Sequence, residues 1–132
     1  MAQNILIVED EMLVAYDMQD ILEVNGYACS GIVPDLASAE EYIDAPLDLA
    51  LVDLNLRDGL TGPEIGARLS SAGVPVIFIT ANPAQIGDGV AGTIGVLTKP
   101  TDEHTLLQAV NYALSRDSTV SSEPPAALRL FA

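Results

Sequence analysis

Basic residues, cysteine and long apolar stretches are all scarce in this chain, and each scarcity excludes a class of function. Five lysines and arginines stand against nineteen acidic residues, and the formal net charge of −14 lacks the basic footprint of a nucleic-acid-binding protein. The single cysteine, Cys29, excludes an internal disulfide and a metal site built from cysteines. No apolar run approaches the roughly 20 residues that span a bilayer. The acidic residues 9–11 interrupt the first run, which is unlike a signal peptide, so we expect a cytoplasmic protein.

The rest of the composition fits one folded domain followed by a tail. A length of 132 residues with 49% hydrophobic residues is enough for a single buried core. We expect this domain to span residues 1–116. From Asp117 onward the chain is rich in serine and proline, which predicts a flexible tail over residues 117–132. Residues 128–131 are apolar apart from Arg129. Two alternatives are open for them: they dock on the domain or on a partner, or they fray as chain ends do.

Four short apolar runs each end in a chemically useful group. Such runs are typical of strands that are buried on both faces of a parallel sheet. The carboxyl ends of parallel strands line one edge of the sheet, where open α/β folds place their sites. The sequence therefore predicts one crevice with acids, a hydroxyl and an ammonium group, which suits phosphoryl transfer. The runs and the groups that follow them are residues 5–8 with Glu9 and Asp10, 49–52 with Asp53, 74–79 with Thr80, and 96–98 with Lys99, the only lysine.

Between these runs lie segments with the spacing and punctuation of helices. Apolar residues recur with helical spacing over 14–22, and Asn25 with the following glycine marks the end of that helix. Ser38 and Thr61 each precede a glutamate by three residues, so both fit a capping box that opens a helix. Residues 101–103, with two acids near the positive end of the helix dipole, open the last helix.

The segment 82–92 is a poor helix former, because it contains Pro83 and three glycines that each cost roughly 1 kcal/mol relative to alanine in a helix. We expect a short or mobile helix there. The alternation of strands and helices along the chain predicts an α/β fold with a doubly wound, five-stranded parallel sheet. Its crossovers are right-handed and its helices cover both faces.

The same residues resemble the receiver domain of two-component response regulators, the CheY-like domain, over residues 1–116. The matching pieces are Ile-Leu-Ile-Val-Glu-Asp-Glu at 5–11, Leu-Val-Asp-Leu-Asn-Leu at 51–56, Phe-Ile-Thr-Ala at 78–81 and Leu-Thr-Lys-Pro at 97–100. Each piece alone is unspecific, but four in this order, each closing an apolar run, are specific. The resemblance implies the flavodoxin-like strand order 2-1-3-4-5.

The resemblance also implies a metal-assisted phosphorylation site. Asp53 is the implied phosphoacceptor, a carboxylate nucleophile that forms an aspartyl-phosphate. The implied cofactor is Mg²⁺, which prefers oxygen ligands and keeps several waters. Asp10 and Asp53 would hold the ion directly, Glu9 through a water, and Asn55 through its backbone carbonyl.

The resemblance implies roles for further residues, which would bind the phosphoryl group or change conformation when it is bound. Lys99 and Thr80 would contact phosphoryl oxygens, and the small Ala81 would leave access to the acceptor. Pro100 would follow Lys99 through a cis peptide bond. Many receivers carry an aromatic residue three positions before the lysine, whereas this chain has Val96. We therefore expect phosphorylation to reorder the region around 82–92 without an aromatic rotamer change.

These features predict a stand-alone response regulator that accepts a phosphoryl group from a histidine kinase. It would act through protein contacts or as a phosphate sink, with no enzymatic activity beyond its own phosphorylation and dephosphorylation. Residues 51–64 resemble receivers that pair with HWE or HisKA2-type kinases. The resemblance also allows a homodimer through the face formed by the fourth helix, fifth strand and fifth helix.

Three alternatives remain open from the sequence. A receiver-fold module could bind partners independently of phosphorylation, although the intact acids and lysine argue against this. A small aspartyl phosphohydrolase usually needs Asp-x-Asp after its first strand, whereas the candidate nucleophile here follows the third. A flavin-binding module of the same fold would have few aromatic residues to stack the flavin, since tryptophan is absent and aromatic residues make up 5% of the chain.

Overall fold

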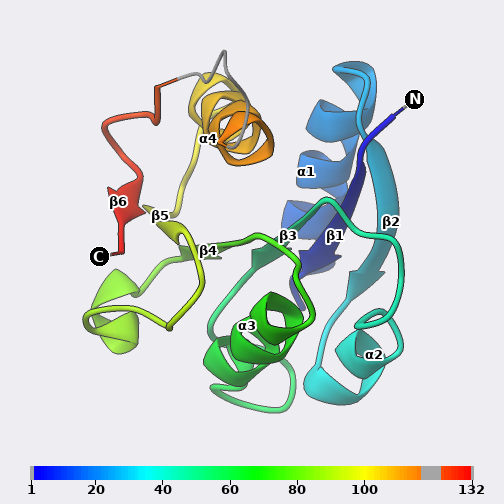
Figure 1. The fold of residues 1–132 in the computed structure, drawn as a ribbon, viewed down its shortest axis with the longest axis vertical. Coiled ribbons are helices and arrows are strands. Elements are labelled where there is room, and N and C mark those ends of the chain that lie inside the picture. The colour runs from blue at the N-terminus through cyan, green and yellow to red at the C-terminus, as the bar shows by residue number, and fades with distance from the viewer. Residues whose placement is uncertain (1, 117–122, 132) are drawn as a thin grey trace.

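A six-stranded sheet with helices on both faces organises the chain (Figure 1). The structure is a computed structural model that describes residues 2–116 and 123–131. The strand order is β2-β1-β3-β4-β5-β6. The first five strands pair in parallel and β6 pairs with β5 in antiparallel fashion. The elements are β1 (Asn4–Val8), α1 (Met12–Val24), β2 (Ala28–Val33), α2 (Leu36–Glu40), β3 (Leu49–Val52), α3 (Gly62–Ser71), β4 (Val76–Thr80), the 3₁₀ helix η1 (Pro83–Ile86), β5 (Gly95–Thr98), α4 (Glu103–Ser115) and β6 (Arg129–Leu130).

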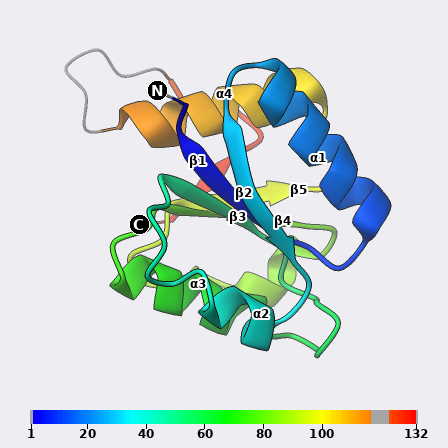
Figure 2. The same ribbon diagram turned by 90° about the vertical axis from the view of Figure 1, so that its right-hand side faces the viewer.

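The predicted parallel order 2-1-3-4-5 is confirmed, and the two faces of the sheet carry separate cores. Ile5 and Ile7 of β1 pack in the core with α1 and α4, whereas Leu6 and Val8 pack in the core with α2 and α3. Figure 2 shows these two helix pairs on opposite sides of the sheet. Each fully buried aliphatic side chain contributes about 1.5–3 kcal/mol, so the continuous apolar runs fix the strands in the middle of the domain. Within the described residues, no helix is both long and apolar enough to cross a membrane.

The second helix begins earlier than the capping-box pattern predicts, so that prediction is wrong. Asp35, not Ser38, is the N-cap residue of α2, and its carboxylate accepts a hydrogen bond from the backbone N–H of Ser38 at 2.9 Å. Its position directly before the helix lets Asp35 satisfy an orphan N–H of the first turn. The third helix does begin after Thr61, but the Thr61 hydroxyl donates to Asp58 at 2.6 Å rather than capping the helix.

Only a short 3₁₀ helix, η1, forms between β4 and β5, as the glycines of this segment predict. Gly87, Gly89 and Gly92 all have positive φ angles of 57°, 117° and 84°. This left-handed region is open to glycine and strained for other residues. The backbone therefore turns three times where a longer α-helix would continue, and the loop reaches β5 without a helix over the sheet.

The end of the chain adds a strand that the sequence did not predict. Residues 129–130 form β6, which lies beside β5 with Gly95 opposite Leu130 and Val96 opposite Arg129. Leu128 is buried, so the docking option holds for the last apolar residues. Two paired residues are too few to show the alternation that identifies a strand from sequence. The predicted flexible tail also includes 117–122, which lie outside the described residues.

Candidate functional site

Three carboxylates converge at the carboxyl edge of the sheet. Glu9 and Asp10 follow β1 and Asp53 follows β3, and one carboxylate oxygen from each lies within 4.8 Å of the others. The two strands are in register, with Val8 opposite Val52. The backbone N–H of Asp53 continues this pairing by donating to the carbonyl of Val8 at 2.9 Å. Parallel pairing thus brings together acids that are more than 40 positions apart in the sequence.

Lys99 closes this acidic cluster from the end of β5. Its ammonium group donates to Oε1 of Glu9 at 2.5 Å and to Oδ2 of Asp53 at 2.9 Å. The other oxygen of Asp53 accepts the backbone N–H of Leu54 at 2.7 Å. Lys99 is held in place by its backbone N–H, which donates to the carbonyl of Thr80 at 2.8 Å. The peptide bond from Lys99 to Pro100 is cis, as the resemblance implies.

Burial makes the electrostatics of this cluster unusual. Glu9 is 1% exposed and Asp53 is 7% exposed. Burial raises the pKa of Glu9 to about 7; the hydrogen bond and charge of Lys99 oppose this rise, while the charge of Asp53 adds to it. Burial alone would lower the pKa of Lys99, but its hydrogen bonds to Glu9 and Asp53 raise it instead. One ammonium group pairs with two of the three carboxylates, which leaves an excess of negative charge for a bound cation to neutralise.

A cavity of about 230 Å³ opens onto these groups. Thr80 lines it from the end of β4, fully buried, and its Oγ1 accepts the backbone N–H of Asn82 at 3.1 Å. Ala81 is exposed at the rim of the cavity. The structure thus brings most of the sequence-predicted site residues to one place. The complete lining is Asp10, Glu11, Asp53, Asn55, Leu56, Thr80, Ala81, Asn82 and Lys99.

Three sequence-predicted residues are not part of this lining. Glu9 lies behind it and pairs with Lys99, which belongs to the lining. Val96 is 1% exposed and packs in the core with α2 and α3. Pro100 instead lines a neighbouring groove of about 590 Å³ with Leu13, Met18 and Leu106. That groove also includes Ala81 and Lys99, so it is continuous with the lining of the smaller cavity.

Sequence reasoning missed Gln85, which reaches the site from η1. Its side-chain oxygen accepts a hydrogen bond from the side-chain amide of Asn55 at 2.7 Å, across 30 positions in the chain. Glu11 was also given no role, although its backbone N–H donates to Oε2 of Glu9 at 3.2 Å. The contact of Gln85 depends on how two distant loops meet, so no local pattern indicates it, whereas the contact of Glu11 joins residues only two positions apart.

Comparisons with known proteins agree with this geometry. Residues 5–111 match the family model of the response regulator receiver domain. The sensory transduction protein RegX3 of Mycobacterium tuberculosis is 30% identical over 91% of this chain and 54% of its own length, so the chain spans about half of that relative. The phyllosphere-induced regulator PhyR of Methylorubrum extorquens is 36% identical over 67% of this chain and 34% of its own length.

Among solved structures, the receiver domain of Erythrobacter litoralis PhyR is similar, with a TM-score of 0.80 and 30% identity. The match covers 92% of this chain and 97% of that domain. The family match covers most of the strands and helices described above, including the strand ends that form the acidic cavity. The chain therefore belongs to the response regulator receiver domain family of two-component signalling.

Proposed function

We propose that this receiver accepts a phosphoryl group from a histidine kinase on Asp53, in a reaction that depends on Mg²⁺. The observation that carries the proposal is the position of Asp53 in the lining of the cavity, where Lys99 donates to one of its carboxylate oxygens. A carboxylate of this kind is a known nucleophile for phosphoryl transfer. Family membership supports the histidine kinase as donor, since receivers are the acceptors in two-component signalling.

The residues of the cavity account for the transfer. A carboxylate oxygen of Asp53 forms a bond to phosphorus while the bond from phosphorus to the donor imidazole breaks, and the imidazole leaves with the electron pair. Lys99 turns its ammonium group from the carboxylate toward a phosphoryl oxygen and balances its charge. The hydroxyl of Thr80 donates to another phosphoryl oxygen. Positioning and charge neutralisation of this kind provide most of the catalysis in phosphoryl transfer.

The acidic cluster fits Mg²⁺ by its donor chemistry. Glu9, Asp10 and Asp53 offer only oxygen atoms, and these lie close enough together to share one ion. Hard divalent cations prefer such ligands, and Mg²⁺ keeps waters that let Glu9 act indirectly. The protein ligands of Mg²⁺ would be the carboxylates of Asp10 and Asp53 and the backbone carbonyl of Asn55. When bound, the ion neutralises negative charge on the transferring group.

We propose that the kinase binds the groove beside the cavity. Leu13 on α1 lines this groove and is 86% exposed. Because Lys99 and Ala81 belong to both linings, a protein seated in the groove reaches the cavity that contains Asp53. The resemblance of residues 51–64 makes an HWE or HisKA2-type kinase the candidate donor. The phosphorylated receiver then signals through contact with another protein, or it acts as a phosphate sink that removes phosphoryl groups from that kinase.

Phosphotransfer from a purified histidine kinase tests this proposal. The kinase is labelled with radioactive ATP and mixed with the chain, with Asp53→Asn, or with Asp44→Asn. Asp44 is exposed and lies beyond α2, away from the cavity, so its variant is a matched control. We expect the label to reach the wild-type chain and the control but not Asp53→Asn. Stable kinase binding without label transfer would favour the alternative, a binding module that works independently of phosphorylation.

A further inference from the structure

The last residues of the chain close the edge of the sheet. Residues 128–131, which we call the C-terminal latch, contain β6 and lie along β5 (Figure 1). The backbone N–H of Phe131 donates to the carbonyl of Ile94 at 3.0 Å, which extends the pairing beyond the strand. Leu128 at the other end of the latch is 5% exposed. The latch therefore has both backbone pairing and buried side chains.

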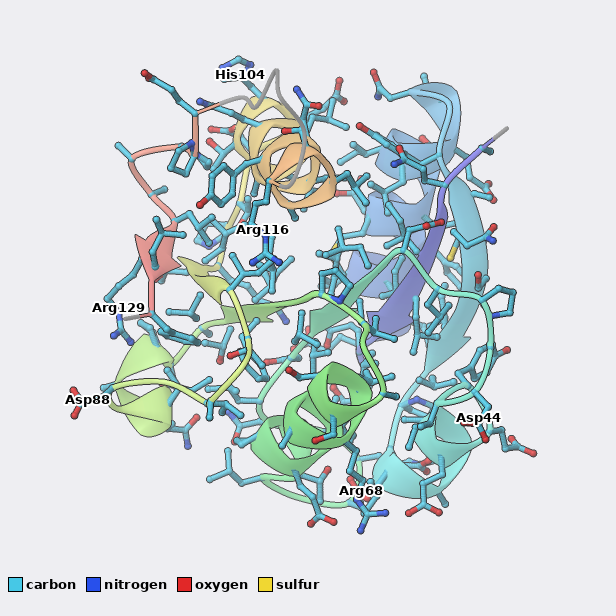
Figure 3. The ribbon with its side chains drawn as sticks, viewed as in Figure 1. Asp44, Arg68, Asp88, His104, Arg116 and Arg129 are labelled. Carbon is cyan, nitrogen blue, oxygen red and sulfur yellow. The ribbon has the colours of Figure 1, made fainter. Side chains whose placement is uncertain are left out.

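The side chains of the latch reach the loop between β4 and β5. Arg129 donates to the carbonyl of Gly87 at 3.1 Å and lies 3.5 Å from the carbonyl of Pro83. Figure 3 shows Arg129 beside the 3₁₀ helix of this loop. The ring of Phe131 packs against Gly89 so closely that a Cβ there would lie 2.5 Å from the ring. The latch thus contacts the loop, residues 82–92, at η1 and at the following turn.

The opposite side of the same loop contacts the phosphorylation site. The backbone N–H of Asn82 donates to Oγ1 of Thr80, and Gln85 accepts from the side chain of Asn55. Both Thr80 and Asn55 line the cavity with Asp53. The loop therefore lies between the cavity and the latch and touches both through hydrogen bonds.

The loop has little internal structure to fix its position. It contains one short 3₁₀ helix and three glycines with positive φ angles. Segments with few internal hydrogen bonds and few buried side chains are the ones that rearrange at low cost. Ile86 of the loop is buried in the core with α2 and α3, and the other contacts that hold the loop are those with the latch and with the cavity residues.

We propose that the C-terminal latch holds the loop in the position described above, and that the latch leaves β5 when Asp53 carries a phosphoryl group. This rests on the proposed function of Asp53. A phosphoryl group recruits Lys99 and Thr80, and Thr80 is the residue that now holds Asn82. Movement of the loop removes the carbonyl acceptors of Arg129 and the glycine surface under Phe131. Val96 and Phe131 both pack in the core with α2 and α3.

Thermodynamic coupling works in both directions. If phosphorylation releases the latch, then a weakened latch must favour the phosphorylated arrangement. Arg129→Ala removes the hydrogen bonds to the loop, and Phe131→Ala removes the ring. Leu130→Ala is the matched control, because Leu130 lies between them on β6 and is 44% exposed.

Hydrogen exchange on the full chain, with and without acetyl phosphate and Mg²⁺, measures the latch directly. The extent of phosphorylation is read by intact mass in the same samples. In the phosphorylated wild type we expect the amides of Phe131 and of residues 82–92 to exchange at least about five-fold faster, the lower end of typical coupling. Arg129→Ala and Phe131→Ala should show this exchange without phosphate and should be phosphorylated to a greater extent. Leu130→Ala should behave as the wild type.

The outcomes separate the two proposals. A phosphoryl adduct with unchanged exchange in the latch and loop overturns the latch and leaves the proposed function standing. The absence of any adduct in the wild type, both from acetyl phosphate and from the phosphorylated kinase, overturns the proposed function, and with it release by phosphorylation. Equal exchange in Arg129→Ala and Leu130→Ala without phosphate shows that the latch does not hold the loop, which also overturns the inference.

Discussion

The carboxylate of Glu9 accepts a hydrogen bond from the ammonium group of Lys99 across 2.5 Å, although the residues are 90 positions apart in the chain. The Glu9 side chain is 1% exposed and that of Lys99 is 16% exposed. A buried charge is costly unless a partner compensates it. Lys99 therefore stabilises the acidic cluster before any cation or phosphoryl group arrives.

Replacing Lys99 with methionine should destabilise the protein when divalent cations are removed. The substitution keeps the length of the side chain but removes the ammonium group that pairs with Glu9 and Asp53. Breaking a buried pair costs about 3–5 kcal/mol, and the open cavity reduces this to about 1–3 kcal/mol. Urea unfolding in EDTA measures the change. Arg116→Met, which removes an exposed charge from the end of α4, is the control, and an equal loss in both variants would contradict the account.

The free energy of unfolding should fall as pH rises from 4.5 to about 7. The pKa of Glu9 is raised from 4.5 to about 7 in the folded protein. Within that range the folded state binds more protons than the unfolded state, so raising the pH favours unfolding. Urea midpoints in EDTA across the range test this. Glu9→Gln should flatten the dependence on pH, and a wild-type slope that survives this substitution would assign the effect to other groups.

Asp10 should be needed for metal binding and not for the fold. It is only partly buried and shares the cluster with Glu9 and Asp53. Its removal relieves repulsion between carboxylates, so Asp10→Asn should unfold at the same temperature as the wild type or higher in EDTA. Mg²⁺ should raise the melting temperature of the wild type by preferential binding to the folded state. Asp10→Asn should lose most of that rise and Asp44→Asn should keep it; equal rises in all three would refute the site.

Leu13 should matter for the kinase and not for the chemistry. Its side chain is 86% exposed on α1 and lines the groove next to the cavity. Leu13→Gln should slow transfer from the kinase at least ten-fold, about the 1.4 kcal/mol expected for one exposed apolar contact, while phosphorylation by acetyl phosphate is unchanged. Val24→Gln is the control, since Val24 is 77% exposed at the far end of the same helix. Equal transfer rates in both variants would place the kinase elsewhere.

The strand ends were predictable from sequence because each is marked locally. An apolar run followed by a polar residue needs no knowledge of the rest of the chain, and parallel pairing then brings Asp53 beside Glu9. The contact between Asn55 and Gln85 was not predictable, since two exposed amides 30 positions apart carry no shared pattern. The strand of the latch was missed for a different reason: with two residues it has no period, and its stability comes from Phe131 and Leu128 packing on the domain.

The N-cap of α2 shows why the capping-box pattern predicted the wrong first residue of a helix. Asp35 and Ser38 are both good capping residues, and the glutamate three positions after Ser38 favoured the later start. The carboxylate of Asp35 also pairs with Arg57 from the loop after β3. This tertiary contact holds Asp35 at the start of the helix, and the sequence pattern around Ser38 does not indicate it.

Intact-mass spectrometry after treatment with acetyl phosphate tests the central claim, that Asp53 is the phosphoacceptor, most directly. The wild-type chain, Asp53→Asn and Asp44→Asn are each treated with Mg²⁺ and with EDTA. We predict a single phosphoryl adduct on the wild type and on Asp44→Asn, formed only with Mg²⁺ and absent from Asp53→Asn. An adduct that persists in Asp53→Asn, or one that forms equally well in EDTA, would contradict the account.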